Sequence, residues 1–234
     1  MKKQASIILA ALLAVSLTAC SGGKTETPAT TAAGETSAAT EAASTAGGDN
    51  TAVSPDNDFV IALQADATHL DPHVSGNGVS NTITNSMYET LVWFDENLEL
   101  KPLLAKSWTV SDDGLDYTFV LNEGIKFHDG EPFNAESIVA NYERAKSDSS
   151  LRLASQTAMW DSVTVDSEYQ VTIHLKEPNN TFLNKLAQVR IVSPKAIKEL
   201  GKDGLAKQSA GTGPFILSER VDGGYTKMVR NENY

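Results

Sequence analysis

The stretch from Ala105 to Ala145 constrains the fold more than any other part of this chain. Apolar and polar residues alternate through it, which predicts strands with one buried face. Asp113-Gly114 interrupts the alternation and is typical of a tight turn between antiparallel strands. Further along, Asn134 can cap a helix that carries Ile138 and Tyr142 on one side. We therefore expect a β-hairpin that leads into an amphipathic helix, a scaffold without a set of reacting groups.

The flanking sequence extends this pattern into a mixed α/β fold. Residues 58–64 alternate as a strand would, with Phe59, Ile61 and Leu63 on one face. Further strands are predicted at residues 91–94, 160–165, 170–176, 191–192 and 215–217, and further helices at residues 79–90, 181–188 and 194–201. Strands and helices mixed in this order indicate an α/β or α+β lobe. Residues 58–234 are numerous enough for one domain with a substantial core.

The first 57 residues have a different composition. Lys2 and Lys3 precede an apolar run that is too short to span a bilayer comfortably, which predicts a secretory signal peptide over residues 1–20. The end of this segment, Leu17-Thr-Ala-Cys20, resembles the lipobox of bacterial lipoproteins, which implies cleavage before Cys20 and lipidation of its thiol. Residues 21–57 are almost entirely small, polar or acidic and cannot bury enough surface to fold, so we expect a disordered tether.

Composition and motifs exclude several classes of function. The net charge of −11 argues against partners such as nucleic acid, and against charge-driven binding to anionic lipid. The sequence contains no glycine-flanked nucleophilic serine, no zinc-protease motif, no phosphate loop and no dinucleotide fingerprint. Gly211-Thr-Gly213-Pro214 is interpreted as a backbone feature rather than a catalytic one. We therefore expect neither an enzyme nor a resident cofactor or metal.

Two groups of polar residues are candidates for binding. His69 and His73 are four residues apart, but Pro72 makes a helix between them improbable, so the spacing does not indicate a metal site. They are interpreted as loop histidines that face solvent or cap a turn. Arg190 interrupts an apolar approach to residues 191–192, where a buried guanidinium would need an anionic partner. The alternative is a surface arginine at the end of a strand.

A series of motifs resembles the N-terminal part of the family 5 solute-binding proteins of bacterial ABC importers, the extracellular peptide- and nickel-binding proteins. The resemblance covers about residues 59–234. The motifs that carry it, in order, are Leu70-Asp-Pro-His73, Met87-Tyr-Glu89, Leu104-Ala-Lys-Ser-Trp108, Ser111-Asp-Asp-Gly114, Gly124-Ile-Lys-Phe-His-Asp-Gly130, Pro132-Phe-Asn-Ala135 and Gly211-Thr-Gly-Pro-Phe215.

The resemblance implies a periplasmic-binding-protein-like fold of the type II topology, in which two lobes close over a ligand. It also implies delivery of that ligand to ABC permease subunits in the membrane, which work with a separate ATPase. Members of the family are much longer, so we expect this chain to be a truncated copy with the first lobe and without the second. With lipid on Cys20, the protein would be a membrane-anchored monomer on the extracytoplasmic side.

The resemblance leaves the ligand open. Residues 186–194 and 229–234 look most like the nickel-type members, which hold a metal through a polycarboxylate or amino-acid chelator by means of arginines. Arg190 matches such an arginine, and Arg152 lies close to the position of another. In the loop after His73, Ser75 stands where nickel-type members can have a tyrosine, so His73 and Ser75 complete the candidate ligand contacts. Peptide-type members fit the sequence as well, and a lipid-anchored surface hydrolase or a structural lipoprotein are the alternatives of another class.

Overall fold

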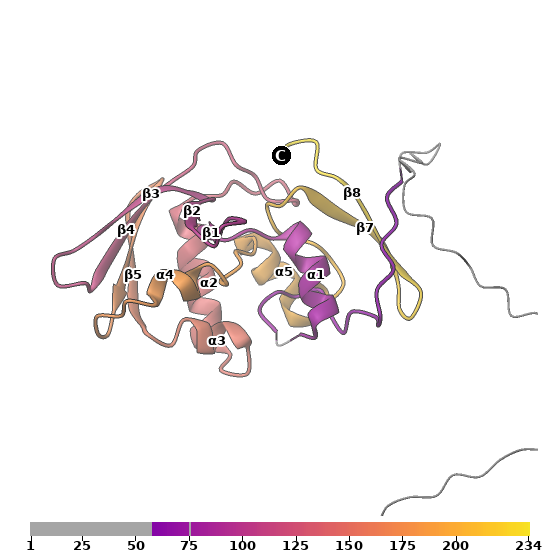
Figure 1. Ribbon diagram of the computed structural model, residues 1–234, viewed down its shortest axis with the longest axis horizontal. Coiled ribbons are helices and arrows are strands. Elements are labelled where there is room, and N and C mark those ends of the chain that lie inside the picture. The colour runs from indigo at the N-terminus through magenta and orange to yellow at the C-terminus, as the bar shows by residue number, and fades with distance from the viewer. Residues whose placement is uncertain (1–57, 75) are drawn as a thin grey trace, which may run out of the picture. The chain divides into compact units, whose positions relative to one another are not determined.

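The computed structural model describes residues 58–74 and 76–234 (Figure 1). The predicted signal peptide, Cys20, the predicted tether and Ser75 lie outside these residues. Residues 58–234 form one compact unit. No helix in the described part of the chain is long and apolar enough to cross a membrane.

The described residues form five helices and eight strands, in the mixed order that the sequence predicts. The helices are α1 (Gly78–Met87), α2 (Ala135–Ser147), α3 (Arg152–Gln156), α4 (Phe182–Leu186) and α5 (Pro194–Leu205). The strands are β1 (Val92–Phe94), β2 (Leu100–Pro102), β3 (Ala105–Val110), β4 (Asp116–Leu121), β5 (Trp160–Ser167), β6 (Gln170–Leu175), β7 (Phe215–Val221) and β8 (Tyr225–Arg230).

The central sheet contains four antiparallel strands in the order β3-β4-β6-β5. The hairpin predicted from the alternating sequence is confirmed, because β3 pairs with β4 with Trp108 opposite Phe119. Gly114 has a φ of +72° in the connecting turn, a conformation that glycine adopts without strain. The inward residues of β4 are Tyr117, Phe119 and Leu121, as the period of two predicts.

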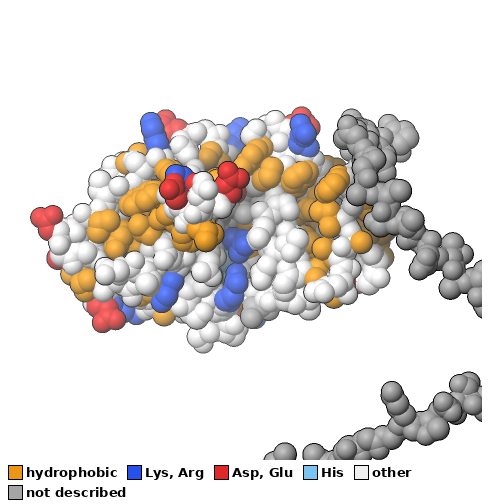
Figure 2. Space-filling view, in the orientation of Figure 1, with side chains coloured by type: hydrophobic (Ala, Val, Ile, Leu, Met, Phe, Trp, Pro, Cys, Tyr) orange, Lys and Arg blue, Asp and Glu red, His pale blue; other side chains and the backbone are white. Residues whose placement is uncertain are grey.

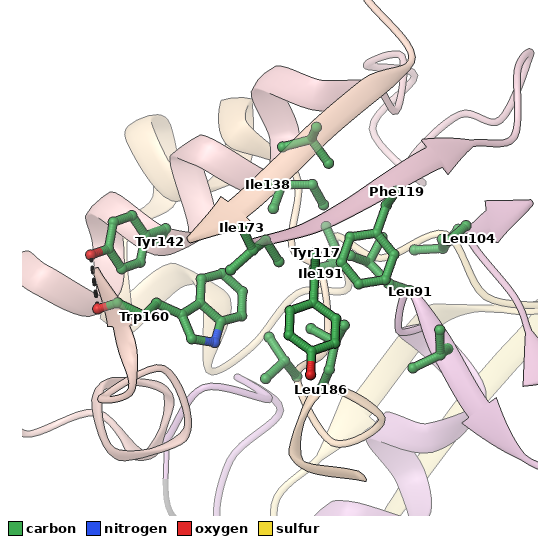
Figure 3. Close-up of a cluster of buried hydrophobic side chains, with 14 of the residues drawn as sticks. Leu91, Leu104, Tyr117, Phe119, Ile138, Tyr142, Trp160, Ile173, Leu186 and Ile191 are labelled. Carbon is green, nitrogen blue, oxygen red and sulfur yellow. Dashed lines mark hydrogen bonds between the residues drawn. The ribbon is translucent and has the colours of Figure 1, made fainter. Parts of the chain in front are cut away.

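Helix α2 packs on this sheet and is capped as predicted. The backbone N–H of Asn134 donates to Ser137 Oγ at 3.2 Å, which satisfies a donor at the start of the helix. On its buried side, Tyr142 stacks on Trp160 with 5.6 Å between ring centroids. Figure 3 shows both rings beside the apolar side chains of the sheet and of Leu186 in α4. These contacts fix α2 against β5 and β6.

The interior consists of two apolar clusters. The larger lies among the central sheet, α2 and α4, and the smaller lies among α1, α5 and the segment around Leu70. Ile191 belongs to the larger cluster and Val192 to the smaller one. Because successive side chains of an extended backbone point in opposite directions, this segment runs between the two clusters. The loop from Leu70 in the smaller cluster to Val74 beside the larger one makes the same crossing.

Two predicted strands do not form. Residues 58–64 have no strand partner among the described residues, and Phe59 is 87% exposed. Alternation alone therefore overpredicts, since a strand needs a neighbour to receive its hydrogen bonds. Residues 191–192 are not a strand either, and only Arg190 forms an isolated bridge, with Thr90.

Other boundaries also differ from the sequence-based expectation. Helix α5 breaks at Gly201 as predicted, with φ +60°, but helical structure resumes and continues to Leu205. Helix α3 and strand β8 were not predicted at all. Figure 1 shows β8 paired with β7 in a hairpin on the side of the unit away from the central sheet.

Candidate ligand-binding site

Three segments that are far apart in the sequence meet between the two apolar clusters. They are the loop at residues 71–74, the start of α3 and residues 188–192. The backbone N–H of Leu153 donates to the His73 carbonyl at 3.3 Å, and Arg152 Nη2 donates to the Pro72 carbonyl at 3.4 Å. His73 Nε2 hydrogen-bonds to the Arg190 carbonyl at 2.7 Å. The structure thus brings together Arg152, Arg190 and His73, three of the four residues predicted as ligand contacts.

Arg190 is partly buried at the edge of this meeting point. Its guanidinium donates to Asn85 Oδ1 of α1, and its backbone forms the bridge with Thr90. Burial, followed by the positive charge of Arg152, lowers the pKa of Arg190 to about 10. The guanidinium therefore stays charged at neutral pH, with a neutral amide as its hydrogen-bond acceptor.

Arg152 is incompletely satisfied as well. Its Nε is buried and has no hydrogen-bond partner among the described residues. Within residues 58–74 and 76–234, neither Arg152 nor Arg190 forms an ion pair with a carboxylate at 4.0 Å or less. Two guanidinium groups that affect each other's ionisation without a counter-charge favour an anion beside them. Guanidinium groups suit a carboxylate in particular, because their planar donors can form two parallel hydrogen bonds to it.

His73 lies deeper than the two arginines. Its side chain is fully buried, and both ring nitrogens are bonded to protein groups. Burial, with the nearby positive charge of Arg144 as the next cause, lowers the pKa of His73 to about 4. The interpretation of His73 as a solvent-facing loop residue is wrong. Its role as a direct ligand contact is not carried forward, because no ring nitrogen is left for a ligand.

Sequence reasoning missed the ion pair beside His73. Arg144 Nη2 lies 2.5 Å from Asp71 Oδ2, and Arg144 Nη1 lies 3.2 Å from Asp71 Oδ1. Both side chains are almost inaccessible to solvent, at 8% for Arg144 and 0% for Asp71. Arg144 was expected only to complement the C-terminal end of α2. No local pattern could reveal the pair, because its members lie in a loop and a helix that are far apart in sequence.

The face drawn in Figure 2 has basic side chains in its middle, with acidic side chains mainly towards the rim. No group of three or more His, Cys, Asp or Glu residues that could hold a metal occurs in the described part of the chain. A hollow of about 530 Å³ lies elsewhere, along β7. Its lining includes the carboxylates of Asp129, Glu219 and Asp222 and shares no residue with the arginine pair. It is therefore a less suitable place for an anion.

Solved structures place the fold among periplasmic ligand-binding proteins. The periplasmic binding protein DppA from Helicobacter pylori, in complex with the peptide STSA, aligns with a TM-score of 0.66 at 28% identity, over 73% of this chain and 38% of that one. NikA from Brucella suis, in complex with Fe(III)-EDTA, aligns with a TM-score of 0.65 at 30% identity, over 74% of this chain and 35% of that one. The class that fold and site define is therefore a lobe of a periplasmic-type binding protein, as predicted.

Sequence comparison gives the family. Residues 99–234 match the family described as bacterial extracellular solute-binding proteins, family 5. The glutathione-binding protein GsiB of Salmonella typhi is 34% identical over 180 residues, which are 76% of this chain and 35% of that protein. The chain belongs to the family 5 solute-binding proteins and spans about a third of the length of the curated relatives it matches.

Proposed function

We propose that this chain is a substrate-binding protein of an ABC importer, held on the extracytoplasmic side of the membrane by lipid on Cys20. In this role it binds a small solute and presents it to permease subunits. Membership of family 5 supports the role, because relatives named as binding proteins share this fold. The work is binding and conformational closure, and no chemical step is assigned to the chain.

The arginine pair carries the proposal for the ligand. Arg152 and Arg190 lie near each other without a carboxylate partner in the described part of the chain, and Arg152 Nε is buried without an acceptor. A ligand carboxylate would supply both the missing charge and the missing acceptor. The ligands in the names of the relatives, glutathione, the peptide STSA and Fe(III)-EDTA, all carry carboxylate groups. We therefore propose a small carboxylate-bearing solute: a short peptide, glutathione or a metal chelate.

The chain supplies one side of such a site. Because it spans about a third of the length of its relatives, we expect it to bind ligand weakly on its own, with a dissociation constant of about 1 mM or higher. NMR detects binding in this range through changes in chemical shift.

The test is a titration of the full chain with glutathione and, separately, with nickel plus histidine. We expect the amide signals of residues 152–153 and 189–191 to shift with one of these ligands. The shifts should be lost in Arg190→Ala and in Arg152→Ala, because each removes half of the cationic pair. Lys185→Ala is the matched control, since Lys185 is an exposed cation on α4 outside the pair. Equal shifts in all three variants would show that the arginine pair is not the site.

A further inference from the structure

Asp71, Arg144 and His73 form a continuous buried network between the two apolar clusters. Arg144 binds both carboxylate oxygens of Asp71, and its Nη1 also lies 2.8 Å from His73 Nδ1. The backbone N–H of His73 donates to Asp71 Oδ1 at 3.0 Å, which closes the loop around the carboxylate. Burying such a pair is expensive, and an apolar replacement would often serve stability as well. Its presence therefore calls for a reason other than stability.

The partners of His73 determine where its proton lies. Arg144 can only donate, so Nδ1 must accept with its lone pair. The Arg190 carbonyl can only accept, so Nε2 must carry the proton. His73 is therefore a neutral ring that connects the ion pair to the backbone of Arg190, with its orientation fixed at both ends.

The same loop also holds the second arginine. The carbonyl of His73 accepts from the N–H of Leu153, and the carbonyl of Pro72 accepts from Arg152 Nη2. One short loop thus contacts the backbone that carries Arg190 and the first turn of the helix that carries Arg152. The Asp71–Arg144 pair anchors this loop to α2, which is itself packed on the central sheet.

We propose that Asp71, Arg144 and His73 are positioning residues, which hold Arg152 and Arg190 at a fixed separation before ligand arrives. Two unpaired guanidinium groups repel each other, so a mobile pair would move apart and would have to be reassembled on binding. A rigid support removes this cost from the affinity. The inference rests on the proposed function for the value of the arginine pair, but the geometry of the network stands apart from it.

The first experiment needs no variant. Nitrogen NMR of the His73 ring in the full chain should show a protonated Nε2 and an unprotonated Nδ1 at pH 7. A ring protonated at Nδ1, or at both nitrogens, would contradict the network and overturn the inference. Since the measurement uses the unchanged protein, it decides even if a variant fails to fold.

The second experiment separates positioning from stability. We would titrate citrate into the wild type, His73→Gln and His73→Leu, and follow the Nε–H signals of Arg152 and Arg190. The glutamine amide can reach the Arg190 carbonyl as Nε2 does, so His73→Gln should bind citrate within about twofold of the wild type. His73→Leu should bind about tenfold more weakly, the scale on which outer partners of binding residues act. Unfolding midpoints of both variants, measured in parallel, report their stability.

The outcomes are distinguishable. If His73→Leu folds, loses stability and yet binds citrate like the wild type, the network is only structural and the inference is wrong. If citrate moves neither arginine signal in the wild type, the proposed function fails at this site, whereas the ring measurement still reports on the network. A tenfold loss in His73→Leu that His73→Gln largely restores supports positioning.

Discussion

At the scale of single residues, depth of burial separates the groups that can meet a ligand from those that support them. Arg190 is partly exposed and stays charged, whereas His73, hydrogen-bonded to its carbonyl, is wholly buried and neutral. The two were grouped as ligand contacts from sequence, because a loop histidine and a loop arginine have the same local appearance. Only the tertiary contacts divide their roles.

The neutral state of His73 predicts a dependence of stability on pH. The pKa is about 4 in the folded chain, against an ordinary value of 6.5 in the unfolded chain. The unfolded chain therefore binds the proton more readily, and stability falls as the pH drops from about 6.5 towards about 4. The loss from this group should approach about 3 kcal/mol. The charged groups that act on the ring are Arg144, Asp71 and Arg152, and burial outweighs the one negative charge among them.

Urea denaturation at pH 7, 5.5 and 4.5 measures this dependence. His73→Gln is the control, because it has no ring to protonate while other groups titrate as before. The difference in the free energy of unfolding between wild type and His73→Gln should shrink as the pH falls. A difference that stays constant over this range would show that His73 does not titrate as inferred.

A second prediction at the residue scale concerns Gly211, where two backbones touch. A Cβ at Gly211 would lie 2.0 Å from the carbonyl oxygen of Met87, an atom that cannot move without shifting α1. Gly211→Ala should therefore lower the free energy of unfolding by about 3 kcal/mol or more, at the upper end of overpacking effects. Gly78→Ala is the control, because nothing lies within 4 Å of a Cβ there. It should change stability by at most about 1 kcal/mol, in the stabilising direction. Equal effects would contradict the close approach.

At the scale of elements, α2 is the support of the candidate site. Arg144 near its C-terminal end holds the loop at residues 71–74, and Asn141 one turn earlier holds the segment after Arg190. Asn141 Nδ2 donates to the Val192 carbonyl at 2.8 Å, and the Val192 N–H donates to Asn141 Oδ1 at 3.0 Å. This side chain therefore completes the hydrogen bonds of a residue that has no strand neighbour.

Removing the amide of Asn141 tests that role. Asn141→Leu would leave the buried N–H and carbonyl of Val192 without these partners, so the free energy of unfolding should fall by about 3 kcal/mol. Glu143→Ala on the same helix is the control, because Glu143 is 58% exposed and should change stability by less than about 0.5 kcal/mol. Thermal or urea unfolding of the two variants measures the contrast. A loss in Asn141→Leu as small as in the control would mean that water replaces the amide.

The elements also show which structure can be predicted from sequence. The β3–β4 hairpin and α2 follow from the sequence, because turn chemistry, period and capping all act within a few residues. The strand expected at residues 58–64 does not form, because pairing depends on a partner that the local pattern does not specify. The Asp71–Arg144 pair and Asn141's contact with Val192 escaped prediction for the same reason. The arginine pair was found through family resemblance, and periodicity contributed nothing to it.

At the scale of the whole molecule, the fold implies that the chain works as one part of a larger binding surface. The described residues expose apolar side chains on residues 59–63 and on the β7–β8 hairpin, including Phe59, Phe215, Tyr225 and Val229. A chain that spans about a third of its relatives' length would lack the contacts that cover such surfaces in them. Weak ligand binding and exposed apolar surface are thus expected together.

Attachment to the membrane is the last property at this scale, and it depends on Cys20, outside the described residues. Buried lipid contributes about 0.8 kcal/mol per methylene, and lasting attachment needs more than one acyl chain, a condition that a diacylglyceryl cysteine meets. Cys20→Ala should therefore move the protein from the membrane fraction to the soluble fraction of cells that process lipoproteins. Ser21→Ala, at the next position, should leave it in the membrane fraction. Labelling with a radioactive fatty acid should mark the wild type and Ser21→Ala but not Cys20→Ala. A Cys20→Ala variant that stays with the membrane would show that the protein is attached by another means.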